Sequence, residues 1–473
     1  MFLQKIKRIK DYQFDKYFNN FWYNSLYTDV RESKLGYRYH YELYGKKENR
    51  IKNLKVFLQT SKYQNTKYRD LILRIIFYLL SLKRSNTFSA TFLNLIALIE
   101  FSKLKKYKFN SIIVTSWLEG GVAEAVKLYS QKLSNNSNIA ILRGLKHSDG
   151  SDLKPMVLEI VNDSIVIDRI PLINPLNSIK LYNSKVSCIE QIHIHHFFEI
   201  EFFVHTLLRT LSSKFFVYIH DYYLFTTKFH LFDDTYGRLD LQIAHQEHPN
   251  ELINLQSLFD RVDVFICPSE NTYIRISKLI HTNKLRWIYP PEDPNIETLS
   301  VKKIGVKEHY SICIIGNMGV YKGSEIITRL IKTIKQKKLP YKLFHFGLNP
   351  VMQNNEYYYN FSNLARSEML SKISTLDLDL ALLPFQAEES YSFALSDVFK
   401  LNLPLISTKV GAIPERCMGR DLTILLDPSS EIDLMLKSIS DLILGNIVSH
   451  RSNIPKNIQL ARNRVVLLPS KLK

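Results

Sequence analysis

From about residue 110, short apolar runs alternate with longer stretches whose apolar residues recur at helical spacing. Short runs bounded by turn residues are typical of buried strands, and the helical spacing is typical of helices that pack on a sheet. The predicted strands of this first series are 111–116, 138–144, 189–197, 214–223 and 262–270. Strands that alternate with helices in this way predict a parallel sheet with crossover connections.

A second series follows the proline-rich segment "RWIYPPEDPN", which we interpret as a linker. Its predicted strands are 310–316, 341–347, 376–385 and 403–411, and its predicted helices are 324–338 and 388–397. The sequence therefore predicts an α/β protein with two facing Rossmann-like domains. The expected parts are a basic helical extension (1–108), the two domains (109–290 and 296–445), and a tail (446–473) that packs back on the first domain.

Composition is ordinary for a soluble globular chain, since 45% of the 473 residues are hydrophobic and 23% are charged. The four cysteines are scattered, which argues against a disulfide scaffold or a zinc cluster and favours a reducing compartment. The start has no apolar core of signal-peptide length. The longest apolar run, 71–82, is interrupted by Arg74 and is too short to span a bilayer. We therefore expect a cytoplasmic protein.

The net charge of +18 is concentrated in residues 1–108, where 23 Lys or Arg face 8 Asp or Glu. A basic end on a nearly neutral body indicates an anionic partner, either lipid or nucleic acid. The basic flanks of 71–82 resemble an interfacial helix and favour peripheral contact with a membrane surface. The alternative is a buried helix pair formed with 88–101. Because no nucleic-acid reading motif is present, nucleic acid is not an expected partner.

Polar clusters follow two strands of the first series. Gly120 and Gly121 come after the first predicted strand and open a helix, whose free N–H groups can receive an anion. The alternative for these glycines is a tight strand–helix turn. His220 and Asp221 follow a strongly apolar strand and are candidates for contact with sugar or phosphate.

The second series opens on the glycine-containing loop "IGNMGVYKGSE". Gly316 loosens this loop, and Lys322 sits where its ammonium group can meet a phosphate. The GxxxxGK[ST] spacing of nucleotide hydrolases and the GxGxxG fingerprint are both absent. The alternative is a solvated lysine on a turn.

The histidine-rich segment "HIHH" raises the question of a metal site. His193 and His195 point to the same strand face, but no nearby cysteine completes a ligand set. We therefore expect no metal.

The stretch "EESYSFALSD" places Glu389 and Asp397 eight residues apart, near one face of a predicted helix. One interpretation is an acidic first turn that complements the helix dipole. The other is a clamp for a charged, hydroxyl-rich ligand. In that case the helix start and Lys322 would neutralise a diphosphate, and the carboxylates would accept hydrogen bonds from hydroxyl pairs.

Several of these segments resemble the GT-B glycosyltransferases, most closely glycosyltransferase family 4, over about residues 110–440. The segments are "EGGVAEAV", "IHDYY", "CPSE", "KGSEIITRLI" and "LPFQAEESYSFALSDVFKLNLPLISTKVGAIPER". The last is the most specific, because it follows the Glu-x7-Glu signature of that family with Asp397 in the second place. The resemblance implies two Rossmann-like domains and a nucleotide-sugar donor that is bound mainly by the second domain.

The same resemblance implies a role for each candidate residue. Glu389 would contact the donor sugar, Asp397 would hold the ribose hydroxyls, and Lys322 would stabilise the leaving diphosphate. The expected catalytic residues are Glu389, Lys322 and His220; the expected donor-binding residues are Gly316, Asn317, Lys322, Ser392, Phe393, Ala394, Asp397 and Arg416; the expected acceptor-side or phosphate-loop residues are Gly120, Gly121 and Asp221. Backbone N–H groups near Phe393 and Ala394 would cradle phosphate. No cofactor or metal is expected, and the family usually retains anomeric configuration.

The sequence differs from the family pattern in three places. Many members carry Arg where this chain has Asn317, and Arg416 is expected to compensate for that cation. Asp397 replaces Glu, which shortens the reach of the carboxylate. The family pattern "HDYxxxCPR" reads "HDYYLFTTK" here.

Residues 14–50 resemble a small module that occurs beside glycosyltransferase domains of bacterial surface-polysaccharide systems. The match is carried by Trp22, Tyr23, Asp29, Val30, His40, Tyr41, Gly45 and Arg50. The alternative is a helical packing unit. The whole sequence predicts a glycosyltransferase that moves a sugar from a nucleotide-sugar donor to a glycan or lipid-linked acceptor of a bacterial surface glycan. The alternative is a non-catalytic GT-B subunit that partners an active transferase.

Overall fold

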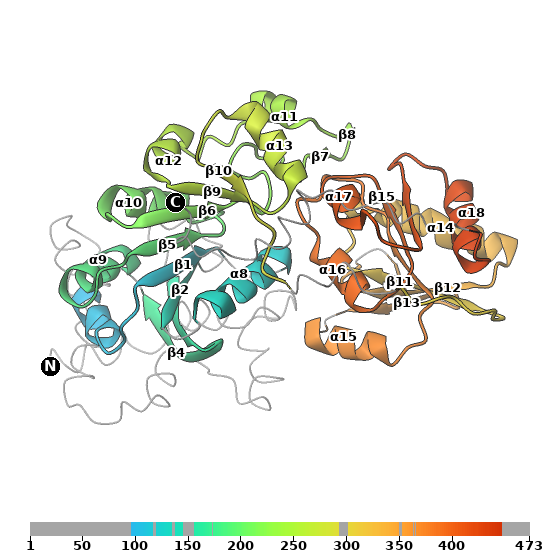
Figure 1. Ribbon diagram of the computed structural model, residues 1–473, viewed down its shortest axis with the longest axis horizontal. Coiled ribbons are helices and arrows are strands. Elements are labelled where there is room, and N and C mark those ends of the chain that lie inside the picture. The colour runs from blue at the N-terminus through green and yellow to red at the C-terminus, as the bar shows by residue number, and fades with distance from the viewer. Residues whose placement is uncertain are drawn as a thin grey trace, which may run out of the picture. The chain divides into compact units, whose positions relative to one another are not determined.

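The computed structural model (Figure 1) describes residues 96–116, 120–134, 138–144, 156–172, 174–292, 301–349, 352–362, 364 and 366–446. These residues form two compact units. The larger contains Tyr107–Arg143, Leu158–Arg169 and the described residues from Ser187 onward, and the smaller includes Ile170–Val186 and the helical residues 96–104. The domain boundaries expected from the sequence remain predictions.

The first sheet has eight strands in the described chain, in the order β10-β9-β6-β5-β1-β2-β3-β4. They are β1 (Ser111–Thr115), β2 (Ile139–Gly144), β3 (Met156–Asn162), β4 (Ile165–Leu172), β5 (Gln191–Ile194), β6 (Lys214–Tyr218), β9 (Val264–Cys267) and β10 (Leu285–Trp287). The pairs that run from β2 through β1, β5, β6 and β9 to β10 are all parallel. This arrangement confirms the parallel sheet that the first apolar series predicts.

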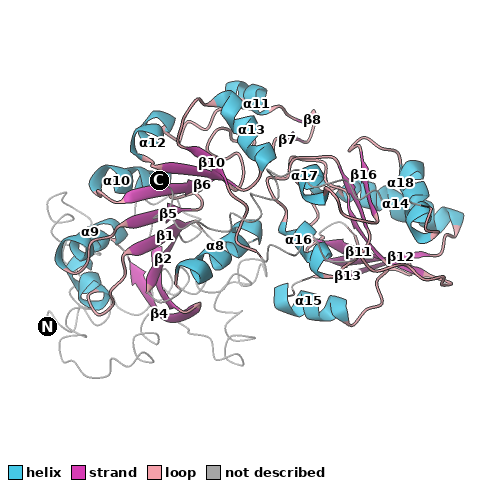
Figure 2. Cartoon of the chain, in the orientation of Figure 1, coloured by secondary structure: helices cyan, strands magenta, loops and turns pink. Residues whose placement is uncertain are grey.

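Helices alternate with these strands, as the cyan and magenta elements of Figure 2 show. In the larger unit they are α8 (Gly120–Leu133), α10 (Glu201–Thr210), α11 (Leu241–Glu247), α12 (Leu255–Arg261) and α13 (Glu270–Leu279), and the smaller unit has α9 (Pro175–Lys185). Ala125 and Tyr129 of α8 pack with Phe216, Tyr218 and Ile266 of the sheet. A short antiparallel pair, β7 (Phe232–Asp233) with β8 (Gly237–Arg238), lies between β6 and α11 in the chain.

Two features of the first sheet differ from the sequence prediction. The neighbouring strands β3 and β4 were not predicted; they flank Asp163 and Ser164, whose φ angles of 43° and 69° fit the two-residue loop of a hairpin. The predicted linker also begins too early, because Arg286 and Trp287 pair with Ile266 and Cys267 as part of β10.

The second sheet has six strands in the described chain, in the order β13-β12-β11-β14-β15-β16, and every pair is parallel. They are β11 (Tyr310–Ile315), β12 (Tyr341–Phe346), β13 (Tyr358–Phe361), β14 (Leu380–Leu383), β15 (Leu405–Thr408) and β16 (Thr423–Leu426). The associated helices are η3 (Val320–Lys322), α14 (Ser324–Lys337), α15 (Arg366–Ser374), α16 (Phe393–Lys400), α17 (Ile413–Cys417) and α18 (Ile432–Ile443).

Alternate side chains of β11 enter two different cores. Ile312 and Ile314 pack with apolar residues of α14 and α18, whereas Cys313 and Ile315 pack with those of α15, α16 and α17. Helices therefore cover both faces of the sheet, as in a doubly wound fold. Because the strands are parallel, the loops that follow β11, β14 and β15 emerge at one edge, which is where such folds bind ligands.

Several predictions concern residues outside the described ranges. These are the basic extension up to residue 95, including the 14–50 module and the 71–82 segment, and the tail from 447 onward. Where the chain is described, no helix is both long enough and apolar enough to cross a membrane.

Candidate functional site

Lys322 and Glu389 form an ion pair at the carboxyl edge of the second sheet. Lys322 ends the single turn η3 after β11, and Glu389 lies in the loop after β14; Lys322 Nζ bonds Glu389 Oε1. The two loops are also joined through the Tyr321 carbonyl, which accepts N–H bonds from Gln386 (2.9 Å) and Ala387 (3.0 Å). The structure therefore brings together the two residues for which the sequence predicts direct roles at the transferred group.

The loop that bears Gly316 and Asn317 is held by its own neighbours. Gly316 has φ +114°, and its carbonyl accepts a bond of 2.7 Å from His345 Nε2. The Asn317 Oδ1 atom accepts the N–H of Leu348 at 2.9 Å. His345 was not singled out from the sequence; its Nδ1 accepts the hydroxyl of Tyr358 at 2.7 Å. The donor-binding roles of Gly316 and Asn317 remain predictions.

The backbone of Glu389 rests against Gly411, in the loop after β15. The carbonyl of Glu389 accepts the N–H of Ala412 at 2.7 Å. Gly411 has φ +52°, and a Cβ at this position would lie 2.1 Å from the Glu389 carbonyl oxygen. Only glycine fits this approach without displacing the loop that carries Glu389.

Alanine at Gly411 is therefore expected to lower the free energy of unfolding by about 2–4 kcal/mol, because a left-handed φ and a backbone clash add together. Gly445→Ala is the matched control, since Gly445 has φ +70° but open space around its would-be Cβ. We expect the control to lose about 1–2 kcal/mol from conformation alone. Urea unfolding of both variants measures the difference, and equal losses would contradict the steric argument.

Glu388 anchors the same loop from the other side. Its Oε2 accepts the N–H of Gly411 at 2.7 Å, and its Oε1 lies 2.6 Å from Arg238 Nη2 and 3.0 Å from Arg275 Nη2. The side chain is only 1% exposed, and the two arginines compensate for its burial. No local sequence pattern marks Glu388 for a role, because its partners lie on distant segments.

The predicted helix 388–397 starts later than expected. The helix α16 begins at Phe393, and Glu389 lies in the preceding loop rather than in the first helical turn. The cause is Ser392, which has φ +74° and caps the helix; its Oγ accepts the Leu395 N–H at 3.4 Å. Glu389 and Asp397 are thus not on one helical face, and only Asp397 belongs to the helix.

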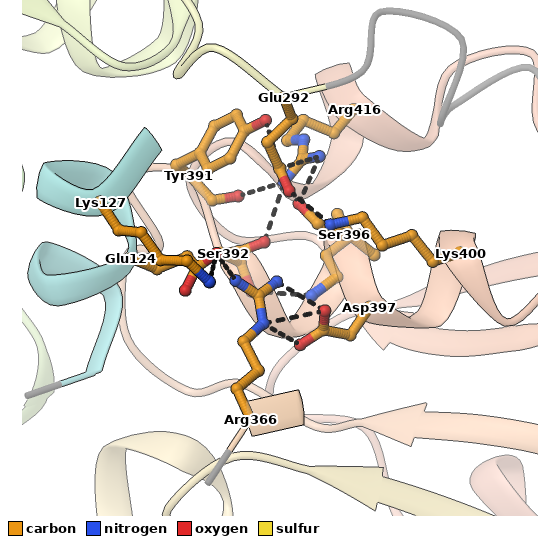
Figure 3. Close-up of polar contacts among 11 residues, drawn as sticks. Glu124, Lys127, Glu292, Arg366, Tyr391, Ser392, Ser396, Asp397, Lys400 and Arg416 are labelled. Atoms are coloured by element: carbon orange, nitrogen blue, oxygen red, sulfur yellow. Dashed lines mark hydrogen bonds and ion pairs between the residues drawn. The ribbon is translucent and has the colours of Figure 1, made fainter. Parts of the chain in front are cut away.

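Arg416 holds this turn through hydrogen bonds to its backbone (Figure 3). Its Nη1 donates to the carbonyls of Tyr391 (3.1 Å) and Ser392 (2.8 Å), and its Nη2 donates to Ser396 Oγ (3.0 Å). The guanidinium carbon lies 3.8 Å from the centre of the Tyr391 ring. Arg416 is fully buried, so contact with a ligand would require these bonds to be released. The geometry favours a role for Arg416 in positioning the Ser392 turn. The direct contact of Arg416 with the donor stays a prediction.

Glu292 completes the buried network around Arg416. Its carboxylate accepts from the hydroxyls of Tyr391 (2.9 Å) and Ser396 and pairs with Lys400 Nζ at 3.1 Å. Although burial acts in the opposite direction, the nearby Arg416 and Lys400 charges hold the pKa of Glu292 below its usual value. Glu292 lies in the segment that the sequence pattern indicates as a linker, so it is not predicted as a functional residue.

Asp397 is paired with Arg366, at the start of α15. Arg366 Nε lies 3.1 Å from both carboxylate oxygens, and Nη2 lies 2.5 Å from Oδ1 (Figure 3). Arg366 Nη1 is also 2.6 Å from Glu124 Oε1 of α8. Burial raises the pKa of Asp397, and Arg366 opposes that shift. The predicted ribose-binding carboxylate therefore comes with a cation that the sequence did not reveal.

The candidates that follow β6, His220 and Asp221, each contact a histidine that follows β5. His220 Nε2 lies 2.9 Å from His195 Nδ1, and the carbonyl of His220 accepts the hydroxyl of Ser390, next to Glu389. Burial lowers the pKa of His220 to about 4, so its imidazole is neutral near pH 7. Asp221 pairs with His196 Nε2 at 3.1 Å.

The paired glycines of α8 lie beside the start of α16. A Cβ added to Gly121 would lie 3.5 Å from the Phe393 ring. Gly120, which has φ +63°, begins the helix. Ala394 follows Phe393 in the first turn of α16. The roles of all these residues toward a ligand remain predictions. No cluster of three or more His, Cys, Asp or Glu side chains suited to a metal occurs within the described ranges.

Comparison with known proteins gives a likeness in structure only. No protein-family model matches the sequence, and no curated protein matches it either. Sucrose-phosphate synthase from Thermosynechococcus elongatus matches with a TM-score of 0.50 at 11% identity, over 76% of this chain and 95% of that chain. The Anabaena protein HepE in complex with UDP-glucose gives 0.49 at 11% identity, over 75% and 95% of the two chains. A glycosyltransferase from Rickettsia africae gives 0.48 at 11% identity, over 76% and 94%.

The likeness to sucrose-phosphate synthase covers 76% of this chain, which is more than the part of the chain that forms either sheet. Together with the parallel second sheet and the parallel strands of the first, it confirms the predicted α/β fold of two Rossmann-like domains, the GT-B architecture. At this level of identity the likeness concerns the fold and not the substrate.

Proposed function

We propose that this chain is a glycosyltransferase that uses a nucleotide-sugar donor. The observation that carries the proposal is the Lys322–Glu389 pair at the carboxyl edge of the second sheet, beside the loop that leads into α16. A lysine and a helix N-terminus suit a diphosphate, and a carboxylate suits sugar hydroxyls. The sequence resemblance to glycosyltransferase family 4 over "LPFQAEESYSFALSDVF" and the GT-B fold support the same conclusion.

The reaction would break the bond between the anomeric carbon and the diphosphate oxygen and form a bond from that carbon to an acceptor hydroxyl oxygen. Lys322 would stabilise the negative charge that develops on the leaving diphosphate, which is the principal demand of this step. The acceptor proton would pass to the leaving phosphate oxygen, so that the anomeric configuration is retained without a protein base. Glu389 would orient the sugar, and Asp397 with Arg366 would hold the nucleoside. No metal is needed in this scheme.

The acceptor would be a glycan or lipid-linked glycan of a bacterial surface polysaccharide. This part of the proposal rests on the resemblance of residues 14–50 and on the basic residues 1–108, which suit an anionic membrane surface on the cytoplasmic side. It would make the chain a peripheral membrane protein.

The second candidate is a non-catalytic subunit of the same fold. It is favoured by one observation: Asn317 stands where many family members carry Arg, and its side-chain oxygen is bonded to the Leu348 N–H. One cation of the expected diphosphate site is therefore missing from that loop.

Binding and turnover across a donor panel distinguish the two candidates. The panel is UDP-glucose, UDP-N-acetylglucosamine, GDP-mannose and ADP-glucose, each tested by calorimetry and by release of nucleoside diphosphate with anionic vesicles present. A transferase is expected to bind at least one donor and to release its diphosphate slowly even without acceptor. A folded protein that binds a donor and never releases diphosphate supports the subunit, and one that binds no nucleotide sugar contradicts the proposed function.

A further inference from the structure

His230 lies next to the turn η3, which carries Lys322, although nothing in the sequence pattern marked it. Its imidazole stacks on the ring of Tyr321, with centroids 4.3 Å apart and planes inclined by 13°. Tyr321 directly precedes Lys322 in η3. The charges of Lys322, Glu389 and Asp221 all act on the imidazole. His230 is thus placed beside the turn that carries Lys322, within reach of the charges of the proposed sugar-transfer pair.

The backbone around His230 is held in a defined conformation. Leu231 is fully buried and has φ +50°, a conformation that a leucine adopts only when its surroundings enforce it. Its N–H donates to the Lys228 carbonyl at 2.7 Å, and its carbonyl accepts the Leu239 N–H at 2.9 Å. Farther along the same segment, Arg238 reaches Glu388 at 2.6 Å. The segment is therefore tied to the loop that carries Glu389.

The ring nitrogens of His230 are available, in contrast to those of three other histidines. His195, His220 and His345 each use a ring nitrogen in a hydrogen bond within the protein. Among the described residues, His230 makes ring contacts with Tyr321 and Phe229 but no hydrogen bond through its imidazole. The side chain is partly exposed and can therefore contact a ligand.

We propose that His230 is a sugar-recognition residue, whose imidazole hydrogen-bonds a hydroxyl of the transferred sugar beside Glu389. This inference rests on the proposed function and adds a specificity residue to it. A neutral imidazole carries one donor and one acceptor, which matches a hydroxyl group. Burial lowers the pKa of His230, and its stacking on Tyr321 fixes the plane in which its nitrogens point. Glu389 would bind one side of the sugar and His230 another.

The test compares the affinity for a nucleotide sugar with that for the bare nucleoside diphosphate. The probes are the best-bound donor of the panel and its diphosphate, measured by calorimetry on the full chain. The sugar gain is the affinity for the donor divided by the affinity for its bare diphosphate. In His230→Ala this gain is expected to fall about tenfold, the effect of one hydrogen bond lost at a desolvated hydroxyl. Affinity for the bare diphosphate is expected to stay unchanged. His230→Gln, which keeps a donor and an acceptor, is expected to retain part of the gain.

His281→Ala serves as the matched control, because His281 is exposed and lies on a loop before β10. An unchanged sugar gain in His230→Ala overturns the inference while leaving the proposed function intact. Equal losses for sugar donor and bare diphosphate also overturn it, since they indicate a general structural role. Wild-type protein that binds no nucleotide sugar overturns both. If His230→Ala fails to fold, as judged by its melting temperature, the test uses His230→Gln instead. The same ratio is measured, namely affinity for the donor divided by affinity for the bare diphosphate.

Discussion

Lys322→Ala is expected to slow sugar transfer by about 100- to 1,000-fold, the usual effect of removing one group that stabilises developing negative charge. Lys322 is held in place by Glu389 and by the Phe385 ring, whose centre lies 4.8 Å from Nζ. The ammonium group is therefore already in position before the diphosphate departs. Pre-organised charge of this kind acts mainly on kcat, because the charge on the leaving group grows in the transition state.

Steady-state kinetics with the best donor of the panel measure this effect. Lys332→Ala is the control, since Lys332 is an exposed lysine on the neighbouring helix α14 and should retain full activity. Lys322→Met keeps the aliphatic stem and separates loss of charge from loss of packing. If the alanine variant stays folded and turns over within about threefold of wild type, Lys322 does not carry the leaving-group role.

Arg416→Met is expected to lower the free energy of unfolding by about 3–5 kcal/mol, the cost of leaving a buried partner uncompensated. Arg416 is fully buried between the Ser392 turn and Glu292. Its removal leaves two backbone carbonyls without their hydrogen-bond donor and removes a positive charge from beside the Glu292 carboxylate. Arg329→Met, on the exposed side of α14, should change stability very little. Urea unfolding at neutral pH compares the two.

The same network predicts a pH dependence with a definite sign. The pKa of Glu292 is lower in the folded protein than its usual value of 4.5. A carboxyl group with a lowered folded pKa contributes stability that is present above its unfolded pKa and is lost as pH falls through the folded one. The difference between wild type and Arg416→Met should therefore shrink as pH drops below 4.5. A constant difference from pH 7 to acid would show that Glu292 and Arg416 are not coupled.

The elements that the sequence predicts best are those set by local pattern. The strands β11 and β14 and the helix α14 follow from apolar runs and helical spacing, and Lys322 and Glu389 follow because both come after parallel strands. Parallel strands place their carboxyl ends together, so proximity in space could be inferred without knowing the fold in detail.

What the sequence did not reveal depends on contacts between distant segments. Arg366 pairs with Asp397 and Glu124, and His230 stacks on Tyr321. These partners lie far apart in the sequence, so no local spacing of residues signals the contacts. Ser392 shows a second limit. Its positive φ delays the start of the predicted helix to Phe393, and no spacing rule anticipates a serine with positive φ whose carbonyl is held by Arg416.

The pairing of β11 with β14 has a consequence for how the protein acquires its candidate site. Ile312 pairs with Leu380, and the chain between them, which contains β12 and β13, has to close into a loop. Such long-range parallel contacts close slowly, because chain entropy is lost before they form. Lys322 follows one of these strands and Glu389 the other, so their ion pair cannot exist until the two strands have met. Donor binding during refolding is therefore expected to appear only after these two strands have paired.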